Sequence, residues 1–218
     1  EAIEVFDFIL DPNVNLSAPS DLNCQVTEVE LNTTVSNGGN FTFVWSTDTG
    51  NFTGDENTLT PTLDAPGNYT ILVTNTTNNC STEESVFVDQ DVSVPVADAG
   101  PPGTLTCSDP VYQIDASGST SGASIEYIWS YTDGNITSGQ STTSPQVNEP
   151  GLYTLTVNNT DNLCSASADL VILEDQVYPV ADAGDDALLG CWAPSLILDG
   201  SASSSGSDFV YTWSSSDG

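Results

Sequence analysis

The side chains with the most distinctive chemistry in this sequence are five cysteines. Cys24 precedes Cys80 by 56 positions, and Cys107 precedes Cys164 by 57 positions. This repeated interval favours two disulfides, Cys24 with Cys80 and Cys107 with Cys164, over free thiols. Cys191 is then left unpaired, because its expected partner falls beyond residue 218. Two cysteines per unit without histidine cannot fill the four positions of a zinc site. The predicted disulfides indicate an oxidising, extracytoplasmic setting.

Charge excludes several classes of function. The chain has no Lys, Arg or His and 31 acidic residues, which gives a net charge of −31. It therefore lacks a base that titrates near neutral pH and a cation that could hold an oxyanion. A glycosidase would need only two carboxylates, but the acidic residues are scattered through turns. We expect no enzyme, no nucleic-acid partner and, without a run of 18 apolar residues, no membrane insertion.

Acidic residues gather near two positions where repeated units would meet. Carboxylates from two units could share a Ca²⁺, which takes six to eight oxygen ligands. A solvated acidic surface is the simpler interpretation, and no cofactor is required. The candidate calcium ligands are Asp89, Asp91, Asp98, Glu174, Asp175, Asp182, Asp185 and Asp186.

Nine Asn-x-Ser/Thr sites could carry a surface glycan. Asn135 is the first choice, because an acidic residue precedes it in "DGNIT". Strand and turn composition alone could account for most of the others. The remaining candidates are Asn15, Asn32, Asn40, Asn51, Asn68, Asn75, Asn79 and Asn158.

An internal repeat places these residues in equivalent positions. "VADAG" occurs at 96–100 and again 84 positions later at 180–184, each time after a proline. In the first copy "NVNLS" stands in its place, which predicts that this one joint differs. The repeat predicts four parts: 1–11 as the last strand of a preceding module, 12–94 and 95–178 as complete modules, and 179–218 as the N-terminal part of a third.

Short alternating runs predict that each module is a β-sandwich. "GNYTILV" (67–73) and "GLYTLTV" (151–157) alternate apolar and polar residues, as a half-buried strand does. Further strands are expected at 41–46, 111–115, 125–130, 169–174, 196–199 and 209–214. A tryptophan on a middle strand and a tyrosine after a Pro-Gly corner resemble the core of immunoglobulin-type sandwiches. The predicted fold is all-β, with tandem immunoglobulin-like modules in an elongated array.

The modules resemble PKD-like repeats (the polycystic-kidney-disease type of β-sandwich) of large Bacteroidota surface proteins and adhesins. The matching residues are the P-V-A-D-A-G opening, "LTC" at 105–107, the "LDGS" turn, the P-G-x-Y-T-L-x-V strand and the "NxxNxC" turn. The W-x-F-G-D-G turn usual in these repeats is reduced here to "WSYTDG" and "WSTDTG". The resemblance implies an exported protein, often secreted by the type IX system.

The predicted function is a structural repeat segment of an extracellular stalk, filament or adhesin at the cell surface. Its expected partners are the neighbouring modules of the same chain, other copies in a fibre, and a glycan or cell-surface ligand bound through distal domains. The alternative is a carbohydrate-binding module. Trp192 is the one tryptophan outside the core-like strand position, so this alternative depends on it.

Overall fold

The structure, a computed structural model, describes residues 11–36 and 40–216, and every regular element within them is a β-strand. No helix in this described part could cross a membrane. The all-β prediction is therefore confirmed. The strands are β1 (Asn13–Ser17), β2 (Leu22–Asn23), β3 (Val29–Glu30), β4 (Asn32–Ser36), β5 (Phe41–Thr47), β6 (Thr62–Leu63), β7 (Gly67–Asn75), β8 (Ser81–Val88), β9 (Gln90–Asp91), β10 (Gly103–Thr106), β11 (Tyr112–Gln113), β12 (Ile125–Thr132), β13 (Ile136–Ser138), β14 (Gln146–Val147), β15 (Gly151–Asn159) and β16 (Ser165–Asp175).

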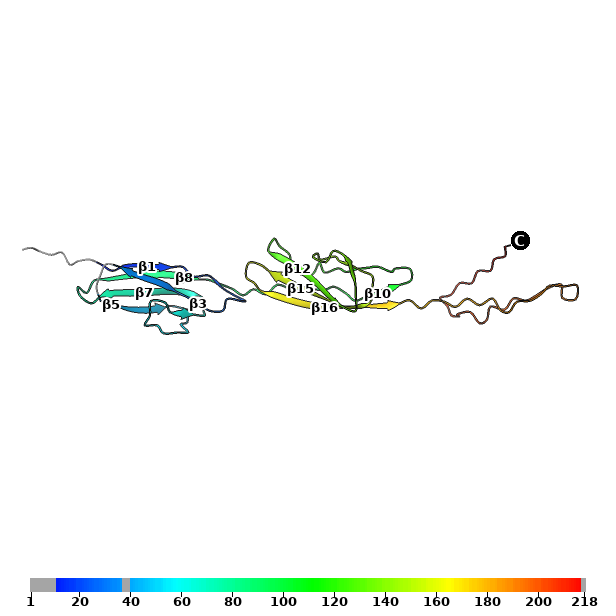
Figure 1. Ribbon diagram of the computed structural model, residues 1–218, viewed down its shortest axis with the longest axis horizontal. Coiled ribbons are helices and arrows are strands. Elements are labelled where there is room, and N and C mark those ends of the chain that lie inside the picture. Colours follow the sequence, from blue (N-terminus) through cyan, green and yellow to red (C-terminus); the bar gives the residue numbers. More distant parts are fainter. Residues whose placement is uncertain (1–10, 37–39, 217–218) are drawn as a thin grey trace, which may run out of the picture.

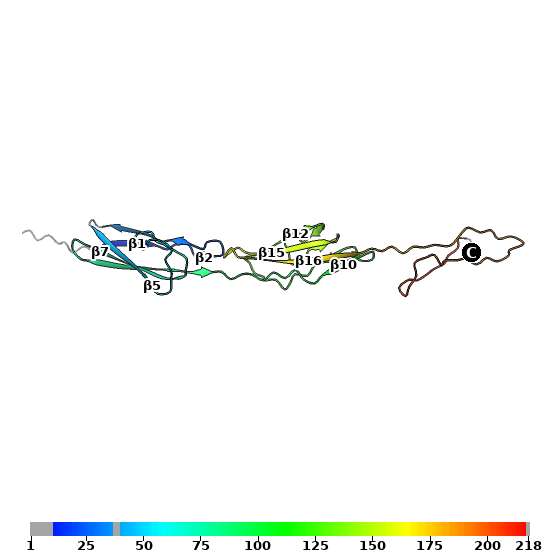
Figure 2. The ribbon, with the colours of Figure 1, turned by 90° about the horizontal axis from the view of Figure 1, so that it is seen from below.

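These strands form two β-sandwich modules that lie end to end along the long axis of the molecule (Figures 1 and 2). Module 1 contains β1 to β9, and its largest sheet has the order β5-β7-β8. Module 2 contains β10 to β16, with a four-stranded sheet β10-β16-β15-β12 and a three-stranded sheet β11-β14-β13. Each module has its own cluster of buried apolar side chains, so neither core depends on the other module.

The core of each module is built on its longest hairpin strand and one tryptophan. Tyr153, Leu155 and Val157 of β15 are fully buried, while the residues between them reach the surface in part. This alternation puts every second side chain against the opposite sheet. Trp45 and Trp129 are also buried, and each indole N–H donates to the carbonyl 13 residues later, at 2.9 and 3.0 Å. The core position predicted for these two tryptophans is confirmed.

The tyrosine of each Pro-Gly corner fastens the corner to the sheet. The hydroxyl of Tyr69 donates to the carbonyl of Ala65, and that of Tyr153 to the carbonyl of Glu149, both at 2.6 Å. Burial raises the pKa of both tyrosines above the ordinary value of 10.0. Each therefore stays a neutral hydrogen-bond donor, as in the tyrosine corner of immunoglobulin-type domains.

In each module a short strand near the start of the sequence runs parallel to the last strand, and both reach the same end of the module. In module 1, β2 pairs with β9, and in module 2, β10 pairs with β16. The hairpin turn before β8 or β16 lies at the opposite end, because those strands extend along the module. Each module therefore has an entry end with the hairpin turn and an exit end next to the following module.

The two modules begin with different backbone structure. In module 1, "NVNLS" forms β1 and pairs antiparallel with β4. In module 2, "VADAG" forms no strand, and the Ser119 and Thr120 hydroxyls accept from the N–H groups of Asp98 and Val96 at 2.9 and 2.8 Å. Gly100 has φ 82°, and a Cβ there would overlap the Asp115 carbonyl oxygen. The two entry segments therefore differ in backbone structure. The predicted difference at the joint before module 1 stays a prediction, because residues 1–10 lie outside the described residues.

Residues 179–216 lack the strands predicted at 196–199 and 209–214. An isolated bridge between Gly190 and Ala193 is the sole ladder contact described there. In modules 1 and 2 the strand that contains the buried tryptophan pairs with β7 or β15, which comes later in the chain. No equivalent strand is described for 179–216, so the two expected strands have no neighbour.

Candidate functional site

The candidate functional site is the joint between modules 1 and 2, where a disulfide connects them. Cys24 is bonded to Cys164, with a Cα–Cα distance of 5.0 Å and 140 positions between them. Cys80, Cys107 and Cys191 are free thiols. The predicted pairs Cys24–Cys80 and Cys107–Cys164 are therefore wrong, and the disulfide lies between modules instead of within them.

The position of the cysteines along the sheet explains this correction. Cys24 follows β2 at the exit end, where β2 pairs with Gln90 and Asp91. Cys80 precedes β8 at the entry end, about ten extended residues from Gln90, or roughly 33 Å. A disulfide needs Cα atoms within about 7 Å. The two cysteines of one module cannot meet, but the exit cysteine of one module can reach the entry cysteine of the next.

Asn162 organises the joint around the disulfide. The backbone N–H of Cys24 donates to the Asn162 carbonyl at 3.3 Å. The Asn162 side chain, which is 2% exposed, donates to the Ser93 carbonyl at 3.0 Å and accepts from the Cys164 N–H at 3.1 Å. One buried amide therefore connects the linker, the disulfide turn and the exit end of module 1.

Asp91 adds a polar contact to this joint. Hydrogen bonds from Ser93 lower the pKa of the Asp91 carboxyl below 3.8, and the backbone N–H of Ser93 has the largest effect. A hydrogen bond with the Asn162 side chain lowers this pKa further. Sequence reasoning missed Asn162. The repeated "NxxNxC" turn was the available signal, since it places an asparagine two residues before each entry cysteine.

Cys80 occupies the entry end of module 1. Desolvation raises the pKa of its thiol above 9.0, and the negative charge of Asp11 and a hydrogen bond with it act in the same direction. The thiol is half-buried, whereas the thiol of Cys107 at the exit end of module 2 is exposed.

Four of the eight predicted calcium ligands accept hydrogen bonds from nearby backbone N–H groups. Carboxylate oxygens of Asp91, Asp98 and Asp182 accept from backbone N–H groups two residues later, and that of Asp89 accepts from Gln90. No group of three or more Asp, Glu, Cys or His side chains in the described ranges is arranged to hold a metal. Glu174, Asp175, Asp185 and Asp186 join no such group either. Calcium at the joints stays a prediction.

The glycan candidates differ in accessibility. Asn75 is buried, with its side-chain oxygen accepting from Thr77. Asn135 and Asn158 are half-buried, and the Asn135 amide donates to Asn148 at 2.7 Å. Exposed acceptor side chains are Asn15, Asn32, Asn40, Asn51, Asn68 and Asn79. Glycosylation stays a prediction, with these six the more accessible sites.

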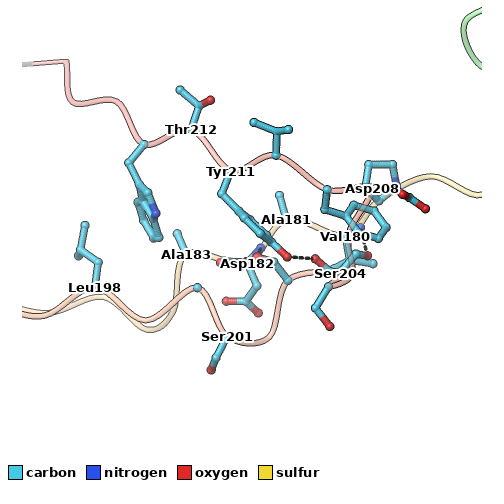
Figure 3. Close-up of a pocket in the computed structure, with 17 residues that line it drawn as sticks. Val180, Ala181, Asp182, Ala183, Leu198, Ser201, Ser204, Asp208, Tyr211 and Thr212 are labelled. Atoms are coloured by element: carbon cyan, nitrogen blue, oxygen red, sulfur yellow. Dashed lines mark hydrogen bonds between the residues drawn. The ribbon is translucent and has the colours of Figure 1, made fainter.

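A hollow of about 890 Å³ lies between the two chain segments of residues 179–213 (Figure 3). It is lined by Leu198, Tyr211 and Trp213, among others. The residues 84 positions earlier include Ile114, Tyr127 and Trp129, which belong to or pack against the core of module 2. The hollow is therefore the open counterpart of a module core, and its shape carries no argument for a ligand.

Comparison with known families finds a match to part of the chain. Residues 92–172 match the model of the PKD domain. No curated protein matches the chain. The PKD match and the strand arrangement agree with the predicted PKD-like type for module 2.

Solved structures of modular proteins are similar to the chain at low identity. Extracellular domains 3–5 of Drosophila OTK match with 14% identity and a TM-score of 0.41 over 75% of this chain and 62% of that one. The eight N-terminal Ig domains of Down Syndrome Cell Adhesion Molecule match with 13% identity and a TM-score of 0.42 over 75% and 25%. A PKD domain from the KIAA 1837 protein matches with 23% identity and a TM-score of 0.30 over 44% and 97%. The chain thus spans less than two thirds of the first two proteins.

Proposed function

We propose that this chain is a segment of an extracellular stalk or adhesin, in which tandem β-sandwich modules hold a distal part of the protein away from a surface. The observation that carries the proposal is the Cys24–Cys164 disulfide between two modules placed end to end. A covalent bond across a joint restricts bending there, which a spacer needs and an isolated binding domain does not. The proposed modules are 12–94 and 95–178, with 179–218 beginning a third.

Chemical composition supports an exported, non-catalytic role. A disulfide persists in oxidising compartments and is rare in the cytosol. The net charge of −31 makes neighbouring chains repel each other, which limits lateral association. We also propose that the chain belongs to a Bacteroidota surface protein secreted by the type IX system. This proposal rests on the residues of the repeat alone.

Small-angle scattering tests the stalk. A compact domain of 218 residues has a radius of gyration of about 17 Å. We expect a clearly larger value for the oxidised chain, with a distance distribution typical of a rod. The Cys24→Ser variant is the matched comparison, and its distribution should broaden because the joint is free to bend. A value near 17 Å for the oxidised chain would contradict the proposal.

A carbohydrate-binding role is the second candidate, because Trp192 is fully exposed at the turn between Gly190 and Ala193. A flat indole face in solvent can stack on a sugar ring. Binding of the chain to a glycan array, lost in Trp192→Ala and kept in Trp213→Ala, would support this role. No binding to any glycan on the array would exclude those sugars as ligands of Trp192.

A further inference from the structure

The exit end of module 2 repeats the strand register that positions the bonded Cys24 in module 1. The two residues before each exit cysteine form a parallel ladder with the last strand of the same module. Between the two modules the residues before the cysteine are 83 positions apart and their partners in the last strand are 84 positions apart. The pairs are Leu22 with Gln90 and Asn23 with Asp91 in module 1, and Leu105 with Glu174 and Thr106 with Asp175 in module 2.

The turn that carries the exit cysteine is also repeated. In module 1 the N–H of Asn23 donates to the carbonyl of Val26 at 2.8 Å, and Cys24 lies between them. In module 2 the N–H of Thr106 donates to the carbonyl of Asp109 at 3.1 Å around Cys107. Cys107 therefore stands in the backbone position that places Cys24 against the next module, and its thiol is exposed.

The entry end of module 1 repeats the other half of the joint. The N–H of Cys80 donates to the side-chain oxygen of Asn78 at 3.0 Å, as that of Cys164 donates to the side-chain oxygen of Asn162 at 3.1 Å. The residue between them is left-handed in both turns, with φ 61° at Asn79 and 58° at Leu163. Cys80 is therefore held in a turn of the same geometry as the turn that holds Cys164.

We propose that Cys107 is the open half of a second intermodule disulfide, and that its partner is the cysteine of an Asn-x-x-Asn-x-Cys turn at the entry end of another module. The evidence is the repeated strand register and the repeated cysteine turn. Where one copy of these features meets a neighbouring module, its cysteine is part of a disulfide. The inference does not rest on the stalk function, since any tandem array of these modules would use the same joint.

The bond forms by thiol–disulfide exchange. Two thiols lose two protons and two electrons to form one S–S bond, and a low-molecular-weight disulfide accepts them and becomes two thiols. Two sources offer the partner turn: a module that follows in the same chain, or Cys80 of a second copy joined head to tail. Both present the same chemistry.

The first experiment uses the 218-residue chain in a buffer of reduced and oxidised glutathione, over a wide range of protein concentrations. We expect a ladder of oligomers on a non-reducing gel. Because the chain lacks Lys and Arg, the linkage is mapped by mass spectrometry after cleavage at acidic residues. The expected crosslink joins Cys107 of one copy to Cys80 of the next. Cys107→Ser and Cys80→Ser should each abolish the ladder, and the matched variant Cys191→Ser should keep it.

The second experiment distinguishes the two sources. Gly218 is equivalent to Gly134, so a copy of residues 135–178 added after Gly218 completes a third module with its own entry cysteine. Loss of the ladder, with Cys107 bonded to the added cysteine, assigns the partner to the following module. A ladder that persists through Cys107 and Cys80 assigns it to a second copy.

Two results would overturn the proposal. One is a Cys107 thiol that stays free in both proteins under the redox buffer while it reacts readily with a maleimide. The other is a ladder that maps to Cys107–Cys107 or Cys191 links. Neither result would contradict the proposed stalk function. Scattering tests that function separately, because it measures the shape of the monomer with its Cys24–Cys164 bond in place.

Discussion

The entry loop of module 2 and that of residues 179–216 have the same local structure in very different surroundings. The N–H of Asp98 donates to the Ser119 hydroxyl at 2.9 Å, and the N–H of Asp182 donates to the Ser203 hydroxyl at the same distance. The tyrosine that follows also donates to the equivalent carbonyl in both regions. These polar contacts recur almost atom for atom.

Burial separates the two regions. Ile114 is fully buried in module 2, and its counterpart Leu198 is 61% exposed. Trp129 is 1% exposed, whereas Trp213 is 54% exposed. The hydrogen-bonded entry loop therefore forms from local sequence alone, while the core requires β15, which arrives from the second half of a module.

The largest difference is expected at the two exit cysteines. Cys24→Ser removes a crosslink that closes a loop of 140 positions, which stabilises the folded chain by about 5 kcal/mol in the chain-entropy model. Cys107→Ser, in dilute protein, should change the free energy of unfolding by less than about 0.5 kcal/mol. Urea unfolding followed by tryptophan fluorescence measures both. Equal effects would show that the joint does not stabilise the modules.

Truncation of an apolar side chain tests the core. Ile114→Ala should lower the free energy of unfolding by about 3 kcal/mol, because it leaves a cavity in a packed site. Leu198→Ala should leave it unchanged within about 0.5 kcal/mol, because Leu198 is mostly in water. The same urea unfolding experiment measures the pair. A large effect of Leu198→Ala would mean that residues 179–216 pack in solution.

Removal of a hydroxyl tests the entry loop. Ser119→Ala should cost about 1 kcal/mol, since the Asp98 N–H loses its acceptor. Ser203→Ala should leave the unfolding of modules 1 and 2 unchanged. Hydrogen exchange should nevertheless accelerate at Asp98 in the first variant and at Asp182 in the second. Unchanged protection at Asp182 would show that its loop does not form independently.

The smallest effect is expected from pH. The side chain and then the backbone of Ser117 hydrogen-bond to Asp115 and lower its pKa below 3.8, and Ser201 does the same for Asp199. A carboxyl with a lowered folded pKa stabilises the fold above 3.8, and this contribution is lost as the pH falls through the folded pKa. NMR titration should show both carboxyls titrating below 3.8. A normal midpoint for Asp199 alone would indicate a looser loop in residues 179–216.

The strands and the core were accessible from the sequence because they rest on short-range patterns. Alternation in "GLYTLTV" predicted which side chains of β15 are buried, and the Pro-Gly-x-Tyr corner predicted the bond made by Tyr153. Period and turn chemistry fix such features within a few residues.

The disulfide was not accessible from spacing alone. Cys24 and Cys80 recur at a constant interval because the module recurs, and this interval says nothing about which end of the sheet each residue occupies. The pairing depends on the parallel ladder between β2 and β9, a contact between residues near the start and the finish of the module's sequence. The strand predicted at 196–199 is absent for a related reason. These residues have the pattern of a strand, but the strand that would pair with them is missing from the described residues.

The Cys24–Cys164 bond also determines how the protein would respond to tension. A pulling force that enters module 1 before Cys24 passes through the sulfur atoms to Cys164 and bypasses the chain between them. At about 3.4 Å per extended residue, these 140 positions represent roughly 480 Å of slack that cannot be released while the bond is intact. Under oxidising conditions the two modules would therefore behave as a nearly inextensible link, and reduction would convert the same chain into a long mechanical extension.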